Sequence, residues 1–129
     1  MIRYLGVDWG QKRIGLAMAE SENSMAIPFK NISNISELFE IIDQEDINEV
    51  IIGEPNKMVG GLDNKEFSRF VDIFRKRSSA LNLKINFVDE RLSSKQADAL
   101  KDKGAKQDRD SVSAMIILQS FLDKKYAKN

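Results

Sequence analysis

The chain has 129 residues and a mass of 14.7 kDa, with 42% hydrophobic and 31% charged residues, which is the composition of an ordinary folded domain. It contains neither cysteine nor histidine, which excludes disulfide frameworks, thiol nucleophiles, Cys/His zinc sites and histidine-based catalysis. The net charge is zero, but residues 20–54 hold nine acids against one base, and residues 57–109 hold thirteen bases against eight acids. Such asymmetry is typical of a local polyanion-binding face, and equally of solvated helix faces of opposite sign.

No apolar run approaches the ~20 residues that a membrane-spanning helix needs. The N-terminal segment Met1–Asp8 has the pattern of a strand and lacks the apolar core and cleavage site of a signal peptide. We therefore expect a cytoplasmic protein without a membrane partner, folded as a single domain over residues 1–129.

Three strands are predicted in the first part of the chain. Ile2–Asp8 and Ile14–Ala19 are short apolar runs, and the polar loop Trp9–Arg13 between them has the length of a hairpin connection. Ile27–Ile32 is a third strand, and Pro28 within it indicates a sheet edge, because proline cannot donate a ladder hydrogen bond.

A helix and a buried strand are predicted next. Ser36 is the candidate N-cap of this helix, whose apolar residues recur at i, i+3 and i+4; they are Leu38, Ile41 and Ile42. The β-branched run Val50–Ile52, closed by Gly53, favours a parallel strand that is covered on both faces.

The second half of the chain predicts three helices and one strand. The first helix has the apolar stripe Phe67, Phe70, Val71, Phe74 and Leu81. The strand Ile85–Val88 follows, and then a short helix with a capping box at Ser93 and Gln96 that stops at Gly104. The last helix has the stripe Ala114, Ile117, Leu118, Phe121 and Leu122. The order βββαβαβαα predicts an α/β fold with a mixed five-stranded sheet flanked by helices.

Three acidic residues lie at the ends of predicted elements. Asp8 closes the first strand, Glu90 closes the last strand, and Asp110 opens the final helix. The carboxyl ends of parallel strands share one edge of a sheet, where ligand sites gather in α/β folds. Converging carboxylates repel one another, and a hard divalent cation such as Mg²⁺ removes that repulsion. Two such ions ~3.5–4 Å apart would activate water and stabilise the leaving oxygen of a phosphodiester.

Each of these acids also has an ordinary structural explanation. Asp110 suits a helix N-cap, and Asp8 suits a turn before Gly10. The run Asp89-Glu90-Arg91 suits a surface cluster of salt bridges. Spacing alone leaves both explanations open.

Four segments then carry a resemblance to a known family. Residues 6–17 match the pattern G-x-D-x-G-x-K-R-I-G-x-A, and residues 50–55 match a strand followed by Gly-x-Pro. Residues 87–94 match V-D-E-R-L-[ST]-[ST], and residues 110–119 match D-x-x-[SA]-A-x-x-I-L-Q. In this order they resemble the YqgF/RuvX family of bacterial RNase H-like proteins, described as nucleases of ribosomal-RNA precursors or as Holliday junction resolvases. The resemblance runs from residue 2 to about residue 122.

The resemblance implies an RNase H-like fold and assigns the catalytic metal ligands. Asp8, Glu90 and Asp110 match the family's three acids, which would hold Mg²⁺ or Mn²⁺, as two ions. Asp89 and Asp108 are the nearest rivals, because the phase of the strand and the start of the helix are uncertain by one residue or more.

Four basic residues are candidates for nucleic-acid binding. Lys12 and Arg13 lie one loop from Asp8 and either hold a phosphate or form a solvated hairpin tip. Lys57 lies in a loop that a substrate strand could pass, and Arg91 either binds phosphate or pairs with Asp89.

Glu54 departs from the family's pattern. It occupies a position that is usually apolar in the family, between Gly53 and Pro55. It is either a fourth ligand or a surface change, and it bears on the choice of substrate and not on the fold.

The function that the resemblance implies is metal-dependent cleavage of phosphodiester bonds in structured nucleic acid. Maturation of the 5′ end of pre-16S rRNA ranks first, and resolution of Holliday junctions in DNA is the alternative. A further alternative is a non-catalytic nucleic-acid-binding factor in ribosome assembly or transcription. The partner is then structured RNA or branched DNA. The chain would act as a monomer or a weak homodimer, and a two-fold dimer would suit a junction.

Overall fold

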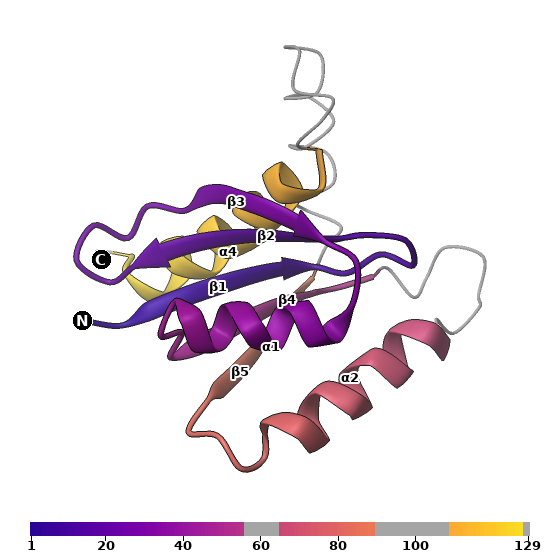
Figure 1. Ribbon diagram of the computed structural model, residues 1–129. Helices are drawn as coiled ribbons and strands as arrows, with labels where there is room; N and C mark the ends of the chain where they lie inside the picture. The colour runs from indigo at the N-terminus through magenta and orange to yellow at the C-terminus, as the bar shows by residue number, and fades with distance from the viewer. Residues whose placement is uncertain (56–64, 90–108, 128–129) are drawn as a thin grey trace.

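The computed structural model describes residues 1–55, 65–89 and 109–127 (Figure 1). Five strands form one sheet in the order β3-β2-β1-β4-β5. They are β1 (Arg3–Asp8), β2 (Ile14–Glu20), β3 (Ile27–Ile32), β4 (Glu49–Glu54) and β5 (Lys84–Asp89). The strands β1, β2 and β3 pair antiparallel, whereas β4 runs parallel to both β1 and β5. The predicted mixed five-stranded sheet and its proline-containing edge strand are therefore confirmed.

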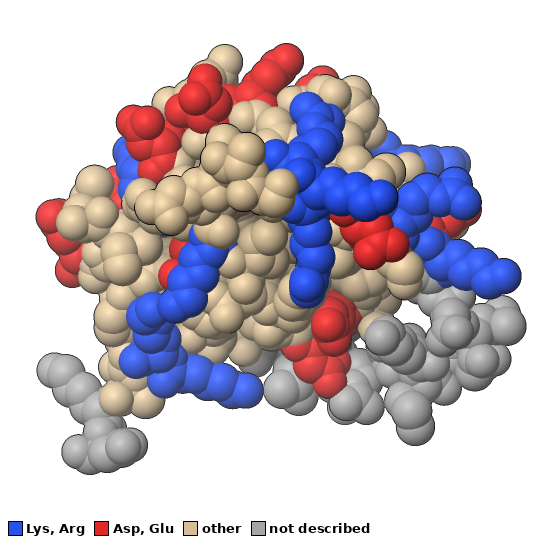
Figure 2. All heavy atoms as spheres, turned by 90° about the horizontal axis from the view of Figure 1, so that it is seen from below, with Lys and Arg blue, Asp and Glu red and all other residues tan. Residues whose placement is uncertain are grey.

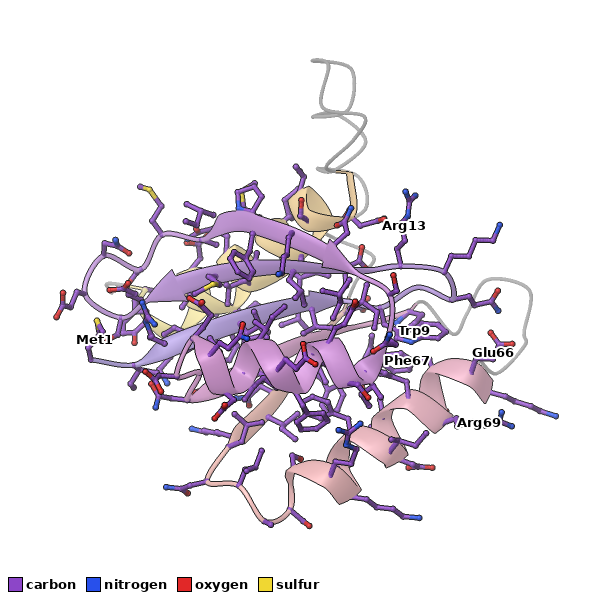
Figure 3. All side chains as sticks on the ribbon, viewed as in Figure 1. Met1, Trp9, Arg13, Glu66, Phe67 and Arg69 are labelled. Carbon is purple, nitrogen blue, oxygen red and sulfur yellow. The ribbon has the colours of Figure 1, made fainter. Side chains whose placement is uncertain are left out.

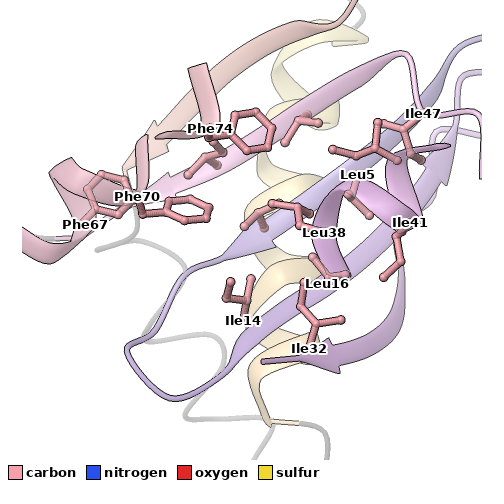
Figure 4. Packing of buried hydrophobic residues seen from close by; sticks show 14 residues of the cluster. Leu5, Ile14, Leu16, Ile32, Leu38, Ile41, Ile47, Phe67, Phe70 and Phe74 are labelled. Atoms are coloured by element: carbon pink, nitrogen blue, oxygen red, sulfur yellow. The ribbon is translucent and has the colours of Figure 1, made fainter. Parts of the chain in front are cut away.

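Helices cover both faces of this sheet (Figure 1). The helices are α1 (Ile35–Gln44), α2 (Lys65–Ser78) and α4 (Arg109–Lys125). On one face, buried residues of α1 and α2 form a single apolar cluster with alternate residues of the strands (Figure 4). On the other face, α4 packs with the remaining strand residues in a second cluster.

The strand β4 contributes to both clusters. Val50 and Ile52 face the cluster of α1 and α2, and Ile51 faces that of α4, all three without solvent exposure. This is the burial on both faces that the β-branched run predicts.

Two details of the helices differ from the sequence-based expectation. Asn34, and not Ser36, caps α1, because its side-chain oxygen accepts a hydrogen bond of 3.0 Å from the Glu37 amide.

The helix α2 ends at Ser78, so Leu81 lies beyond it and is 47% exposed. The hydroxyls of Ser78 and Ser79 donate to carbonyls of the last turn, a local bond that competes with helix continuation. The helix predicted to stop at Gly104 lies outside the described residues.

The close approach of α4 to the sheet depends on glycine. A Cβ at Gly6 would lie 2.8 Å from the Ala114 carbonyl oxygen and 2.8 Å from the Leu118 Cβ. A Cβ at Gly15 would overlap the backbone of Asp110. Only glycine allows backbone-to-backbone contact at these points.

A buried tyrosine joins the sheet to the end of α4. Tyr4 has no solvent exposure, and its hydroxyl lies 2.6 Å from that of Tyr126. Burial, and then the Tyr126 hydroxyl, raises the pKa of the Tyr4 phenol.

The helices in the described part of the chain are all too short or too polar to cross a membrane.

We expect Gly15→Ala to lower the free energy of unfolding by about 3 kcal/mol, since the added methyl group meets rigid backbone. The matched control is Gly53→Ala, whose methyl group meets the side chain of Ile117, with the Cδ1 atom nearest, and no backbone atom among its nearest neighbours. This control should lose about 1 kcal/mol, because a side chain can shift. Urea denaturation measures both, and equal losses in the two variants would contradict the role given to Gly15.

We also expect stability to fall at alkaline pH. A tyrosine in the unfolded chain ionises near pH ~10, whereas the folded protein holds Tyr4 protonated to higher pH. The stability that this difference provides is therefore present below pH ~10 and is lost as the pH rises above it. The free energy of unfolding, measured from about pH 8 to about pH 11, should fall less steeply in Tyr4→Phe; identical slopes would refute the interpretation.

Candidate active site

The hairpin of β1 and β2 brings two of the predicted acids to one corner of the sheet. Asp8 is the last residue of β1, and its partner across the ladder is Gly15 of β2. The backbone of Asp110, in the first turn of α4, packs directly against Gly15. Asp8 and Asp110 therefore both adjoin Gly15, although they are far apart in sequence.

Asp110 carries an ion pair in this corner. The Arg13 Nε lies 3.2 Å from the Asp110 Oδ2, with the Arg13 side chain 65% exposed and the Asp110 side chain 25% exposed. Since α4 begins at Arg109, Asp110 lies inside the first turn and is not the N-cap. Arg13 thus pairs with one of the predicted ligands while most of its side chain remains exposed at the hairpin tip. Lys12 beside it is exposed.

The other predicted site residues divide into two groups. Asp89 is the last residue of β5, exposed and paired in register with Glu54, so β4 separates it from Asp8. Glu90, Asp108, Lys57 and Arg91 lie outside the described residues. Within residues 1–55, 65–89 and 109–127, no three acidic side chains gather as a metal site. Asp8 and Asp110 are thus the part of the predicted triad that the structure brings together.

The loop between β1 and β2 rests against the start of α2 (Figure 3). The Trp9 ring centroid lies 5.8 Å from that of Phe67 and 6.1 Å from that of Phe70. The Gln11 amide donates a hydrogen bond to the Glu66 carboxylate. Trp9 is thus a packing residue. Its ring contacts and the Gln11–Glu66 hydrogen bond together hold α2 beside the site. No sequence pattern links Gln11 with Glu66, so sequence reasoning missed this neighbour.

A row of basic side chains, here called the α2 ridge, follows the outer face of α2. It consists of Lys65, Arg69 and Lys76, which are exposed and recur at i, i+4 and i+11 on the face opposite Phe67, Phe70 and Phe74. Asp72 lies in the same row, so the row has a net positive charge but is interrupted by one negative charge. Figure 2 shows basic side chains gathered over this part of the molecule.

The chemistry of the corner suits a hard cation. Its two carboxylates offer only oxygen ligands, and neither a thiolate nor an imidazole exists anywhere in the chain to favour a softer metal. Rigid strand and helix ends hold both acids at an accessible edge of the sheet. The residues present therefore fit Mg²⁺ or Mn²⁺.

Comparison with known proteins gives relatives along almost the whole chain. A protein of Maridesulfovibrio salexigens, named "Putative pre-16S rRNA nuclease", is 35% identical over 94% of this chain and 98% of its own length. A protein of the same name from Chlamydia pneumoniae is 36% identical over 93% of this chain and 89% of its own length.

Solved structures share the fold at much lower identity. Thermus thermophilus RuvC in complex with a Holliday junction substrate has a TM-score of 0.64 at 12% identity, covering 98% of this chain and 97% of its own. The Fowlpox virus resolvase, in complex with Holliday junction DNA, has a TM-score of 0.66 at 9% identity over 97% and 99%. These likenesses confirm the predicted RNase H-like fold.

The family model RuvX, described as Holliday junction resolvase, matches residues 2–124. With this match and relatives above 30% identity over nearly the whole length, the chain belongs to the YqgF/RuvX family.

Proposed function

We propose that this protein is a metal-dependent endonuclease that cleaves structured nucleic acid, with the 5′ end of pre-16S rRNA as its substrate. The observation that carries the proposal is the convergence of Asp8 and Asp110 on Gly15 at the open corner of the sheet. Nuclease activity agrees with membership of the family, and the rRNA substrate is the one named in its relatives. Such a substrate would place the protein in the cytoplasm.

The acids would hold the metal. Asp8 and Asp110 are two ligands, and Glu90, which follows β5 in sequence, is the proposed third. Bound Mg²⁺ or Mn²⁺ would supply the activation of water and the stabilisation of the leaving oxygen. The protein contributes the position of the ligands, since Asp8 is fixed by the β1–β2 ladder and Asp110 by the first turn of α4.

The basic residues would bind the substrate backbone. Arg13 holds the Asp110 carboxylate and exposes a guanidinium suited to bidentate contact with phosphate. Lys12, Lys57 and Arg91 are the other proposed phosphate contacts near the acids. The α2 ridge would extend this surface away from the cleaved bond, because α2 is fixed beside the loop of residues 9–13.

Resolution of Holliday junctions is the second candidate. It is favoured by the description of the family and by the fold shared with resolvases solved on junction DNA. A junction requires symmetric cuts in two strands and so a two-fold pair of subunits, whereas a single rRNA end requires one copy.

We expect Asp8→Asn and Asp110→Asn each to lower the cleavage rate by about 100-fold or more, since each removes a charge that holds the metal. Cleavage of an end-labelled pre-16S rRNA fragment and of a four-way DNA junction, with Mg²⁺ or Mn²⁺, measures the effect and ranks the substrates. Asp43→Asn, at an exposed position of α1, is the matched control and should keep full activity.

Full cleavage by Asp8→Asn would refute the ligand assignment. If the wild type cuts neither substrate but binds as tightly as Asp8→Asn, the protein is a binding factor in ribosome assembly or transcription and not a nuclease.

We further expect Arg69→Gln and Lys76→Gln to weaken binding of any nucleic-acid sequence and to reduce the dependence of affinity on salt. Each lost phosphate contact should lower the slope of log K against log salt by about 0.7–0.9. Lys84→Gln is the control, because Lys84 is exposed at the opposite end of the sheet, where β5 begins. Fluorescence anisotropy at several salt concentrations gives the slopes. An equal change in Lys84→Gln would show that the α2 ridge is not part of the binding surface.

A further inference from the structure

A cavity lies between α2 and the ends of β4 and β5. Its volume is about 330 Å³, near the lower limit of ligand pockets and suited to one planar ring system. The apolar wall is formed by Phe67, Val71 and Phe87. The polar rim is formed by Glu54, Asp72 and Arg75.

The cavity adjoins the candidate active site. In the register of β1 and β4, Val7 pairs with Ile52, so Asp8 and Glu54 end neighbouring parallel strands at the same edge of the sheet. Phe67, which lines the cavity, packs on Trp9, and Trp9 directly follows Asp8. Side chains alternate along the strands, so Asp8 points to the α4 face with Gly6, whereas Glu54 and the cavity lie on the α2 face with Ile52. A nucleic-acid strand that crosses these strand ends from a phosphate at Asp8 would reach the cavity.

The lining has the chemistry that recognises a nucleobase. The Arg75 guanidinium lies 5.3 Å from the centroid of the Phe87 ring, so a planar cation and an aromatic side chain occur together. Bases stack on aromatic rings and on guanidinium planes, and carboxylates accept hydrogen bonds from the N–H groups at base edges. Glu54 and Asp72 provide such acceptors at the rim. A role as hydrogen-bond acceptor for a base would explain Glu54, the acid at a position that is usually apolar in the family.

We infer that this cavity receives one unpaired base of the substrate, close to the phosphate that is cleaved. The inference rests on the proposed function and narrows it to substrates with an unpaired nucleotide beside the cut. Such a nucleotide enters a pocket at the lowest energetic cost, since no base pair has to be opened.

The test uses two RNA hairpins that differ only in one bulged nucleotide, the fluorescent base 2-aminopurine. Binding of the full chain is measured without divalent metal, so that no cleavage occurs. We expect the wild type to bind the bulged hairpin on the order of tenfold more tightly than the fully paired one. The fluorescence of the bulged base should change on binding, because its stacking changes.

A matched pair of variants separates the cavity from general charge. Arg75 and Arg77 are both exposed arginines of α2, each over a phenylalanine ring, but only Arg75 lines this cavity. Arg75→Ala should abolish the preference for the bulged hairpin, whereas Arg77→Ala should keep it. Ser68→Trp, which fills the cavity from an exposed position, should act like Arg75→Ala, and circular dichroism checks that each variant is folded.

Equal binding of both hairpins by the wild type, or an equal effect of Arg75→Ala and Arg77→Ala, would overturn the inference. The proposed nuclease would still stand in that case if the wild type cleaves its substrate with metal. Failure of the wild type to bind either hairpin would instead overturn the proposed function, and the inference with it.

Discussion

The contact between the start of α4 and the β1–β2 hairpin depends on the absence of a side chain at Gly15. Any Cβ there would overlap the Asp110 backbone, and a Cβ at Gly6 would crowd the next turns of the same helix. With both glycines, α4 packs backbone to backbone on the sheet and covers its second face. This packing determines the geometry of the site as well as the stability of the fold. It places the first turn of α4, which contains Asp110, beside the end of β1, which contains Asp8.

The same geometry explains the ion pair of Arg13. Asp8 and Asp110 bring two negative charges to the corner around Gly15, and a neighbouring cation offsets them. Arg13 lies in the hairpin loop between Asp8 and Gly15. The same hairpin therefore positions Asp8 and supplies the positive charge that pairs with Asp110. Because Arg13 is mostly exposed, the pair contributes little to folding, and its arginine stays accessible to a phosphate.

Sequence patterns predict those features that depend on neighbours in the chain. The hairpin, the edge strand with Pro28, the doubly buried β4 and the stripes of the helices follow from local spacing, and the structure confirms them except for Leu81, which lies beyond α2. The cap of α1 is misplaced by two residues because Asn34 and Ser36 both suit that position, and only the backbone decides between them. The contact of Gln11 with Glu66 and the cavity beside Glu54 join segments distant in sequence, which periodicity does not relate. The motifs place Asp8, Glu90 and Asp110 in one triad, and the described structure juxtaposes the first and the last.

The arrangement separates the part that would carry out chemistry from the part that would choose a substrate. The acids lie on β1 and α4, which are fixed by backbone contact and tolerate little change. The ridge lies on α2, and the cavity lies between α2 and the ends of β4 and β5. The helix α2 is attached through the Trp9 and Gln11 contacts and through the stacked rings of Phe74 and Phe39 of α1. The outer face of α2 packs against no other element in the described structure, so its side chains can vary without disturbing the core or the acids. A fold built in this way could keep one phosphodiester chemistry and direct it to RNA ends or to DNA junctions by changes on α2 and at the strand ends beside it.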